Sequence, residues 1–253
     1  MDNLFEQNAK LWWDKNGPYR ILHKINNLRI SFILRCLIDF KIFEGKDSIT
    51  MLDVGCGGGV ASEALAKYNI HVTGIDESPS SIEEAKKNSY SRDRVEYVHS
   101  NISNYIKLCK KNNKKFDHIC ALEVIEHVIE PRQFIIDCLS VLKPGGLIFI
   151  STINRTNKAL LFAKILAEYI LDIIPRGAHE FSKFIKPNEI ELYLNEHSCQ
   201  ILKMQGIVFK IKPSFSSENW WLDNVGNWEI SDNLDVNYIL CAKLLKAPDH
   251  ENI

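Results

Sequence analysis

The stretch LDVGCGGGVASEALA at residues 52–66 decides the fold. Its first residues end a short apolar run, four glycines follow within five positions, and helix-forming residues come after them. Glycine has no Cβ and accepts positive φ, so a turn of this kind lets the backbone approach a ligand closely. The first N–H groups of the following helix also point at that ligand. The stretch therefore predicts a strand, a ligand-binding turn and a helix.

The same alternation continues on both sides of this stretch. Apolar runs predict strands at 50–54, 71–75, 95–98, 116–122 and 147–151, and helical patterns fall between them at 61–68, 80–88, 103–111 and 131–142. A further helix from Pro187 to about 195 precedes strands at 201–208 and 237–244, which a tryptophan-bearing loop separates. Repeated β-α-β units predict a doubly wound, Rossmann-like α/β fold with a mostly parallel sheet.

Two segments stand outside this alternation. Residues 1–45 are helical in pattern and predict an N-terminal cap, leaving 46–253 as the main domain. Residues 155–186 carry a long helical pattern after the fifth predicted strand, followed by a basic and aromatic stretch. We expect this second segment to be an insertion over the edge of the sheet where the ligand binds.

The bulk composition excludes several classes of protein. A formal net charge of −1 over 253 residues gives no general attraction to nucleic acid, so no nucleic-acid partner is expected. The seven cysteines form no CxxC pair, and the first residues lack the basic and apolar regions of a secretory signal. The apolar stretch 159–174 is interrupted by charges and is too short for a bilayer span. A cytoplasmic protein is the expectation.

The details of the glycine turn narrow the choice of ligand. The dinucleotide fingerprint G-x-G-x-x-G would need a glycine where Val60 stands, so an NAD-dependent oxidoreductase is disfavoured. Asp76 ends the second predicted strand nineteen positions after Gly57, where a carboxylate can accept hydrogen bonds from the hydroxyls of an adenosine ribose. The alternative for Asp76 is a helix cap or a solvated loop residue.

These residues, with the stretch TGID at 73–76, resemble the class I methyltransferases. The resemblance implies S-adenosylmethionine as the cofactor, and a sheet of seven strands whose last is antiparallel. Gly55 and Gly57 then form the cofactor turn. Asp53 is expected to orient the cofactor's amino group, through water or directly, rather than to act in the chemistry.

Blocks outside the turn resemble the ubiquinone-biosynthesis O-methyltransferase family more sharply. They are WWD at 12–14, LHKIN at 22–26, LR at 28–29, EVIEHV at 123–128, LKPGG at 142–146, STINR at 151–155, KFIKP at 183–187 and DVNY at 235–238. The resemblance implies transfer of a methyl group to phenolic hydroxyls of polyprenylated ubiquinone precursors, 2-polyprenyl-6-hydroxyphenol and 3-demethylubiquinol. It also implies a ubiquinone-biosynthesis complex as a partner.

Position by position, the family resemblance carries over two further cofactor residues. Arg29 would clamp the methionyl carboxylate, for which a guanidinium fork is well suited, whereas an exposed helical arginine is otherwise a surface residue. Leu122 would lie near the adenine, where the family often has methionine. The segment at 209–228 departs from the family because it is longer than the expected loop.

Glu123, Glu126 and His127 follow the fourth predicted strand, at the edge where open α/β sheets bind ligands. A phenol ionises near pH ~10, so it needs help to become a nucleophile at neutral pH. The three residues could hold Mg²⁺ as a Lewis acid, and the family resemblance supports this metal site. Alternatively His127 is a general base without metal, or the residues merely stabilise a loop.

A polyprenylated acceptor also demands contact with a membrane. The apolar helical pattern at 160–174, with basic residues nearby, has the composition of an interfacial amphipathic segment, so residues 158–186 are expected to contact the inner face of the membrane peripherally. Packing of the same helix on its own sheet fits the periodicity equally well. A methyltransferase for another acceptor and a non-catalytic, cofactor-binding subunit remain alternatives for the whole protein.

Overall fold

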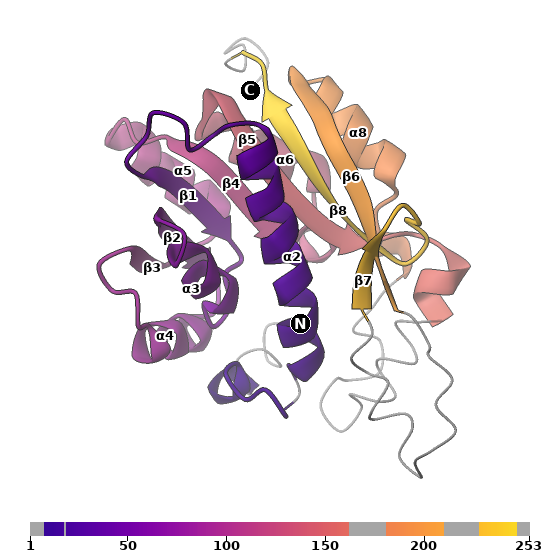
Figure 1. The fold of residues 1–253 in the computed structure, drawn as a ribbon, viewed down its shortest axis with the longest axis horizontal. Helices are drawn as coiled ribbons and strands as arrows, with labels where there is room; N and C mark the ends of the chain where they lie inside the picture. The colour runs from indigo at the N-terminus through magenta and orange to yellow at the C-terminus, as the bar shows by residue number, and fades with distance from the viewer. Residues whose placement is uncertain (1–7, 18, 162–180, 210–227, 247–253) are drawn as a thin grey trace.

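A computed structural model describes residues 8–17, 19–161, 181–209 and 228–246. Its centre is one sheet with the strand order β3-β2-β1-β4-β5-β8-β6-β7 (Figure 1). The strands are β1 (Ile49–Val54), β2 (Ile70–Asp76), β3 (Val95–His99), β4 (Phe116–Leu122), β5 (Leu142–Ile153), β6 (Cys199–Phe209), β7 (Trp228–Ser231) and β8 (Asn237–Leu244).

The pairing of the strands confirms a mostly parallel sheet. β1 pairs in parallel with β2 and β4, and the parallel pairing extends to β3 on one side and β5 on the other. The last strand, β8, runs antiparallel to both β5 and β6. β7 is an eighth, edge strand antiparallel to β6, formed at the end of a stretch that we expected to be a loop.

Helices cover both faces of the sheet, as the doubly wound fold requires (Figure 1). One face carries α2 (Arg20–Asp39), α3 (Val60–Ala66) and α4 (Pro79–Asn88). The other carries α5 (Ile102–Lys111), α6 (Pro131–Ser140) and α8 (Pro187–Asn195). The apolar side chains of each helix layer and of the facing side of the sheet form two buried clusters. Burial of these two clusters is the main favourable contribution to folding.

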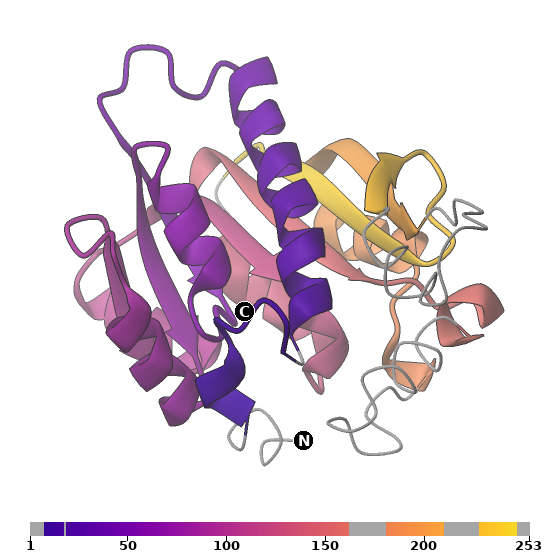
Figure 2. The ribbon, with the colours of Figure 1, turned by 60° about the horizontal axis from the view of Figure 1, so that its bottom comes forward.

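The N-terminal segment contributes to this core. The amphipathic spacing within α2 places Ile33, Cys36 and Leu37 entirely out of solvent, and the helix packs against α3 and against the β6–β8 side of the sheet. Upstream of it, the 3₁₀ turn η1 (Ala9–Leu11) lies beside α4 (Figure 2). A domain boundary at residue 45 remains a prediction.

The turn at 143–146 differs from its predicted place. We expected a helix through Leu142, but α6 ends at Ser140 and β5 already begins at Leu142. The residues Lys-Pro-Gly-Gly form a bulge, because Phe116 pairs with Leu142 while His118 pairs with Leu147. Gly145 has a φ of +80°, a conformation that a residue with a Cβ rarely adopts.

The predicted insertion lies largely outside the described residues. Residues 157–161 are helical and η3 (Phe181–Lys183) is a 3₁₀ turn, whereas 162–180 are not described. Among the helices that the structure describes, none is long and apolar enough to span a bilayer.

The parallel strands bring the predicted site residues to one edge. Gly55 follows β1, Asp76 ends β2, and Glu123 follows β4. Because β1 lies between β2 and β4, these three positions are neighbours at the carboxyl edge of the sheet.

His118 lies in β4 near the amino edge of the sheet, and its protonation tests how well the core is packed there. Its ring is buried, its Nδ1 accepts a hydrogen bond of 3.1 Å from the backbone N–H of Leu147, and burial lowers its pKa to about 4. Below pH 6.5 the unfolded chain binds a proton at this histidine that the folded chain does not, so stability falls between pH 6.5 and about 4. The His118→Asn variant keeps an acceptor for Leu147 without titrating.

Chemical denaturation at pH 7 and pH 5 measures this effect. Between these pH values the wild type should lose about 2 kcal/mol more stability than His118→Asn. Other titrating groups contribute equally to both proteins. The same loss in both would contradict burial of a neutral His118.

Candidate active site

The glycine turn after β1 adopts the conformation that its sequence predicts. Gly55, Gly57 and Gly59 have φ values of +70°, +52° and +82°. The N–H groups of Gly55 and Cys56 donate to the carbonyl of Ile75 at 2.8 and 3.0 Å. These two bonds fix the turn against the end of β2.

Asp76 lies directly against this turn. Its Oδ2 accepts a hydrogen bond of 2.8 Å from the N–H of Gly57, and its Oδ1 accepts one of 2.9 Å from the N–H of Ser78. The structure therefore brings together the glycines and the acidic residue that the sequence paired over nineteen positions. The carboxylate is half-buried, and its role at the ribose of a nucleoside remains a prediction.

Two tryptophans from the N-terminal segment cover the turn. A Cβ added to Gly58 would come within 2.4 Å of Trp12, and one added to Gly57 within 2.6 Å. The indole N–H of Trp13 donates to the carbonyl of Gly58 at 2.9 Å, and that of Trp12 to Ser81 Oγ at 3.1 Å. Glycine is therefore needed at 57 and 58 because the Trp12 ring packs there.

Asp53 supports the turn from within the core. It is 2% exposed; its Oδ2 accepts a 2.6 Å hydrogen bond from Ser62 Oγ, and its Oδ1 one of 3.3 Å from the thiol of Cys120. Burial, and secondarily the charge of Asp76, raise the pKa of Asp53 to about 6. Both oxygens thus bind core side chains, and a role at the cofactor remains a prediction.

Glu123 is the centre of a polar cluster after β4. Its Oε1 accepts a 2.8 Å hydrogen bond from Ser151 Oγ and lies 2.9 Å from Nη2 of Arg29. The amide Nδ2 of Asn237 lies 3.0 Å from each carboxylate oxygen. The backbone of Glu123 has a φ of +58°, which is uncommon outside glycine. In this conformation the side chain meets Ser151 of β5 and Asn237 of β8 at the edge of the sheet.

Arg29 is the cation of this cluster and is almost fully buried, at 4% exposure. Among the described residues, its Nε and Nη2 have no hydrogen-bond acceptor. Its contact with Glu123 is an ion pair that is not aligned as a hydrogen bond. A buried guanidinium with unpartnered donors is unfavourable by itself and is suited to an anionic ligand.

Glu126 and His127 do not join Glu123 in a metal site, contrary to one prediction. The 3₁₀ turn η2 (Ile125–His127) buries Glu126, which is 3% exposed and accepts a 2.9 Å hydrogen bond from Thr152 Oγ1, whereas His127 is exposed. Burial, and then the charge of Glu123, raise the pKa of Glu126 well above its usual range. Within the described residues, no three His, Cys, Asp or Glu side chains are placed to hold a metal ion.

The arrangement gives a physical reason for this correction. Arg29, Ser151 and Asn237 already bind the Glu123 carboxylate, so its oxygens are occupied by a cation and by hydrogen-bond donors. The residues as arranged therefore do not fit Mg²⁺, and no chemical step is assigned to a metal here.

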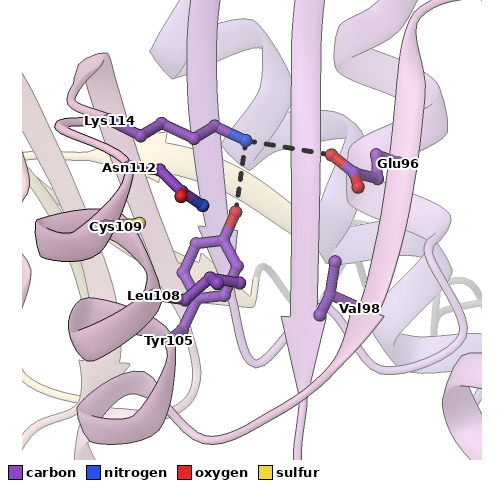
Figure 3. A pocket seen from close by; sticks show the side chains of 7 residues that line it. All are labelled: Glu96, Val98, Tyr105, Leu108, Cys109, Asn112 and Lys114. Carbon is purple, nitrogen blue, oxygen red and sulfur yellow. Dashed lines mark hydrogen bonds and ion pairs between the residues drawn. The ribbon is translucent and has the colours of Figure 1, made fainter.

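A small cavity of about 150 Å³ lies elsewhere, between β3 and α5 (Figure 3). Lys114 reaches over it to the hydroxyl of Tyr105 at 3.3 Å and to Glu96 at 3.8 Å. Of its lining residues, Glu96 is the second residue of β3 and Lys114 precedes β4, so both lie at the amino ends of these strands. The cavity is therefore separate from the candidate active site.

Three polar or aromatic residues of the site were not among the predicted site residues. Trp12, Ser151 and Asn237 contact the glycine turn or Glu123. Each lies in a block that carried the family resemblance, WWD, STINR or DVNY. Leu122, the predicted adenine contact, is half-buried at the end of β4 beside Glu123.

Comparison with known proteins identifies the class first. Residues 52–150 match the family described as a methyltransferase domain. The fold resembles that of magnesium protoporphyrin IX methyltransferase from Synechocystis PCC 6803 with bound SAH, with a TM-score of 0.57 at 18% identity over 87% of this chain and 83% of that one. Fold and site thus define a class I methyltransferase.

The relatives then identify the family. The chain is 38% identical over 246 residues to a ubiquinone biosynthesis O-methyltransferase of Rickettsia prowazekii, covering 94% of this chain and 88% of the relative. It is 35% identical to a mitochondrial ubiquinone biosynthesis O-methyltransferase of Schizosaccharomyces pombe, covering 94% and 84%. The chain belongs to the ubiquinone biosynthesis O-methyltransferase family.

Proposed function

We propose that this chain transfers the methyl group of S-adenosylmethionine to a phenolic hydroxyl of a polyprenylated ubiquinone precursor. The names of the relatives support this acceptor class, since the first relatives are all ubiquinone biosynthesis O-methyltransferases over most of their length. Structural neighbours with bound SAM or SAH support the cofactor.

The observation that carries the proposal is the buried Arg29 at the carboxyl edge of the sheet, whose Nε and Nη2 make no hydrogen bond to any described residue. A carboxylate can accept two parallel hydrogen bonds from a guanidinium, and S-adenosylmethionine carries a carboxylate on its methionyl part. Arg29 would bind that end and Asp76 the ribose. The other predicted cofactor residues are Asp53, Gly55, Gly57 and Leu122.

When bound, the cofactor supplies a methyl group on a positively charged sulfur. In the transfer, the phenolic oxygen would form a bond to this methyl carbon as the carbon–sulfur bond breaks, and the electron pair of the broken bond would stay on the sulfur. The protein must hold the oxygen in line and exclude water. Trp12 and Trp13, which cover the glycine turn, would serve the second purpose.

The hydroxyl proton needs a base, for which we propose His127. Its ring is exposed at the edge of the site, so a substrate can reach it, whereas Glu126 is buried against Thr152. An imidazole is suited to taking a proton at neutral pH. Glu123 would orient Arg29 and Asn237 rather than take the proton, because both already bind it.

A transfer assay with labelled S-adenosylmethionine and a short-chain demethylubiquinol analogue tests this function. We expect the label to be recovered as an aryl methyl ether. His127→Asn should lower kcat by about 100-fold without changing cofactor affinity. The matched control is His71→Asn, an exposed histidine near the start of β2, at the opposite edge of the sheet.

The outcomes separate the alternatives. Cofactor binding without transfer to any phenol would contradict the function and favour a different acceptor or a non-catalytic subunit. Full activity in His127→Asn would contradict the base assignment. If a chelator abolishes transfer and Mg²⁺ restores it, a metal ion rather than His127 activates the phenolic hydroxyl in the enzyme–substrate complex.

We further propose that the chain acts at the cytoplasmic face of a membrane through residues 158–186. Of this segment 158–161 and 181–186 are described, and Leu161 is 62% exposed and Phe181 37% exposed. Exposed apolar side chains beside Lys158 and Lys183 suit an anionic lipid surface. Membership of a biosynthetic complex remains a prediction.

Co-sedimentation with anionic liposomes tests the membrane contact. Leu161→Asp should lower the bound fraction several-fold, because a charge replaces an apolar side chain at the lipid surface. Leu245→Asp is the control, since Leu245 is 56% exposed and follows β8 at the opposite edge. Equal binding of folded Leu161→Asp and Leu245→Asp would contradict the proposal.

A further inference from the structure

Asn237 occupies a position in the site that the proposed chemistry does not yet use. It is the first residue of β8, paired with Ile153 of β5 and Ile207 of β6. Because β8 runs antiparallel to β5, its first residue lies at the carboxyl edge with Glu123. The side chain is buried, at 5% exposure.

The contacts of Asn237 fix the orientation of its amide. Its Nδ2 lies 3.0 Å from both carboxylate oxygens of Glu123. A carboxylate only accepts hydrogen bonds, so the NH₂ group must face Glu123 and the carbonyl Oδ1 must face away from it. The reversed amide would place three oxygens against one another.

The Oδ1 atom is therefore an acceptor with a defined direction. It is buried, and among the described residues it has no hydrogen-bond partner. A buried acceptor without a partner is unfavourable, and a ligand donor would relieve this. Arg29 Nη2 is in an ion pair with the same carboxylate, and among the described residues neither it nor Nε makes a hydrogen bond.

The place of β8 in the sheet indicates which ligand supplies the donor. The glycine turn and Asp76 follow β1 and β2, whereas β8 is separated from β1 by β4 and β5. Three strand spacings amount to about 14 Å between the axes of β1 and β8. Asn237 thus comes from the side of the sheet away from the ribose, where the methyl acceptor would lie.

We propose that Asn237 binds the acceptor, its Oδ1 accepting a hydrogen bond from a ring hydroxyl of the phenol. The inference rests on the proposed function and adds the residue that selects a hydroxylated ring. A site built around a hydroxyl rejects an analogue that lacks it, because the buried acceptor is then left unpaired. Glu123 holds the amide in this orientation, and Arg29 and Ser151 hold Glu123.

Steady-state kinetics of Asn237→Ala test this assignment. The variant should raise the KM for the phenolic acceptor about tenfold while the Kd for S-adenosylmethionine stays within about twofold. The wild type should also bind the hydroxylated acceptor more tightly than a competitive inhibitor in which hydrogen replaces the ring hydroxyl. Asn237→Ala should lose this preference in binding. Asn112→Ala is the matched control, since Asn112 is an exposed asparagine that follows α5, outside the candidate active site, and this variant should keep the preference.

Other outcomes overturn the inference. A preference retained in Asn237→Ala would show that Oδ1 does not select the hydroxyl. A raised Kd for S-adenosylmethionine with an unchanged acceptor KM would assign Asn237 to the ammonium group of the cofactor. If the wild type transfers no methyl group to any phenol, the proposed function itself has failed.

A measurement on the wild type keeps the inference testable if the variant does not fold. In protein labelled with ¹⁵N-asparagine, the side-chain amide signal of Asn237 should shift when the phenolic analogue is added. S-adenosylmethionine alone should shift it less, because the cofactor acts on this amide only through Arg29 and Glu123. A shift with the cofactor alone that is as large as with the analogue, or no shift with either ligand, would contradict the assignment.

Discussion

The ion pair between Arg29 and Glu123 is the interaction on which the site depends. It joins α2 of the N-terminal segment to the residue that follows β4, with 2.9 Å between Nη2 and Oε1. Both side chains are largely buried, so removing either partner would leave an uncompensated charge in the protein. The N-terminal segment is therefore part of the site as well as of the core.

The geometry of Glu123 explains why so many groups meet at one carboxylate. Its positive φ turns the chain sharply at the end of β4, where Ser151 of β5 and Asn237 of β8 reach it from neighbouring strands. Uncommon backbone conformations of this kind tend to occur at functional sites. Within the part of the chain that the structure describes, Nε and Nη2 of Arg29 make no hydrogen bond beside this carboxylate, and Oδ1 of Asn237 accepts none. Both are complementary to ligands that carry the opposite hydrogen-bonding groups.

The sequence predicted the fold well where the pattern is local. The strand at 116–122 and the pairing of Gly57 with Asp76 were found as predicted, because alternation and strand ends are set by nearby residues. The predicted metal triad is not assembled among the described residues, since spacing along the chain does not give side-chain direction. The turn η2 buries Glu126 and exposes His127. Asn237 could not be predicted as a partner of Glu123, because 114 positions and the order of the strands separate them.

The central claim is that Arg29 binds the carboxylate of the cofactor, and a binding cycle tests it most directly. The Kd values of S-adenosylhomocysteine and of its analogue without the carboxylate are measured for the wild type and for Arg29→Gln. The account predicts that loss of the carboxylate weakens binding at least about tenfold in the wild type and has little further effect in the variant, because the two changes remove the same interaction. An equal loss in both proteins would contradict it.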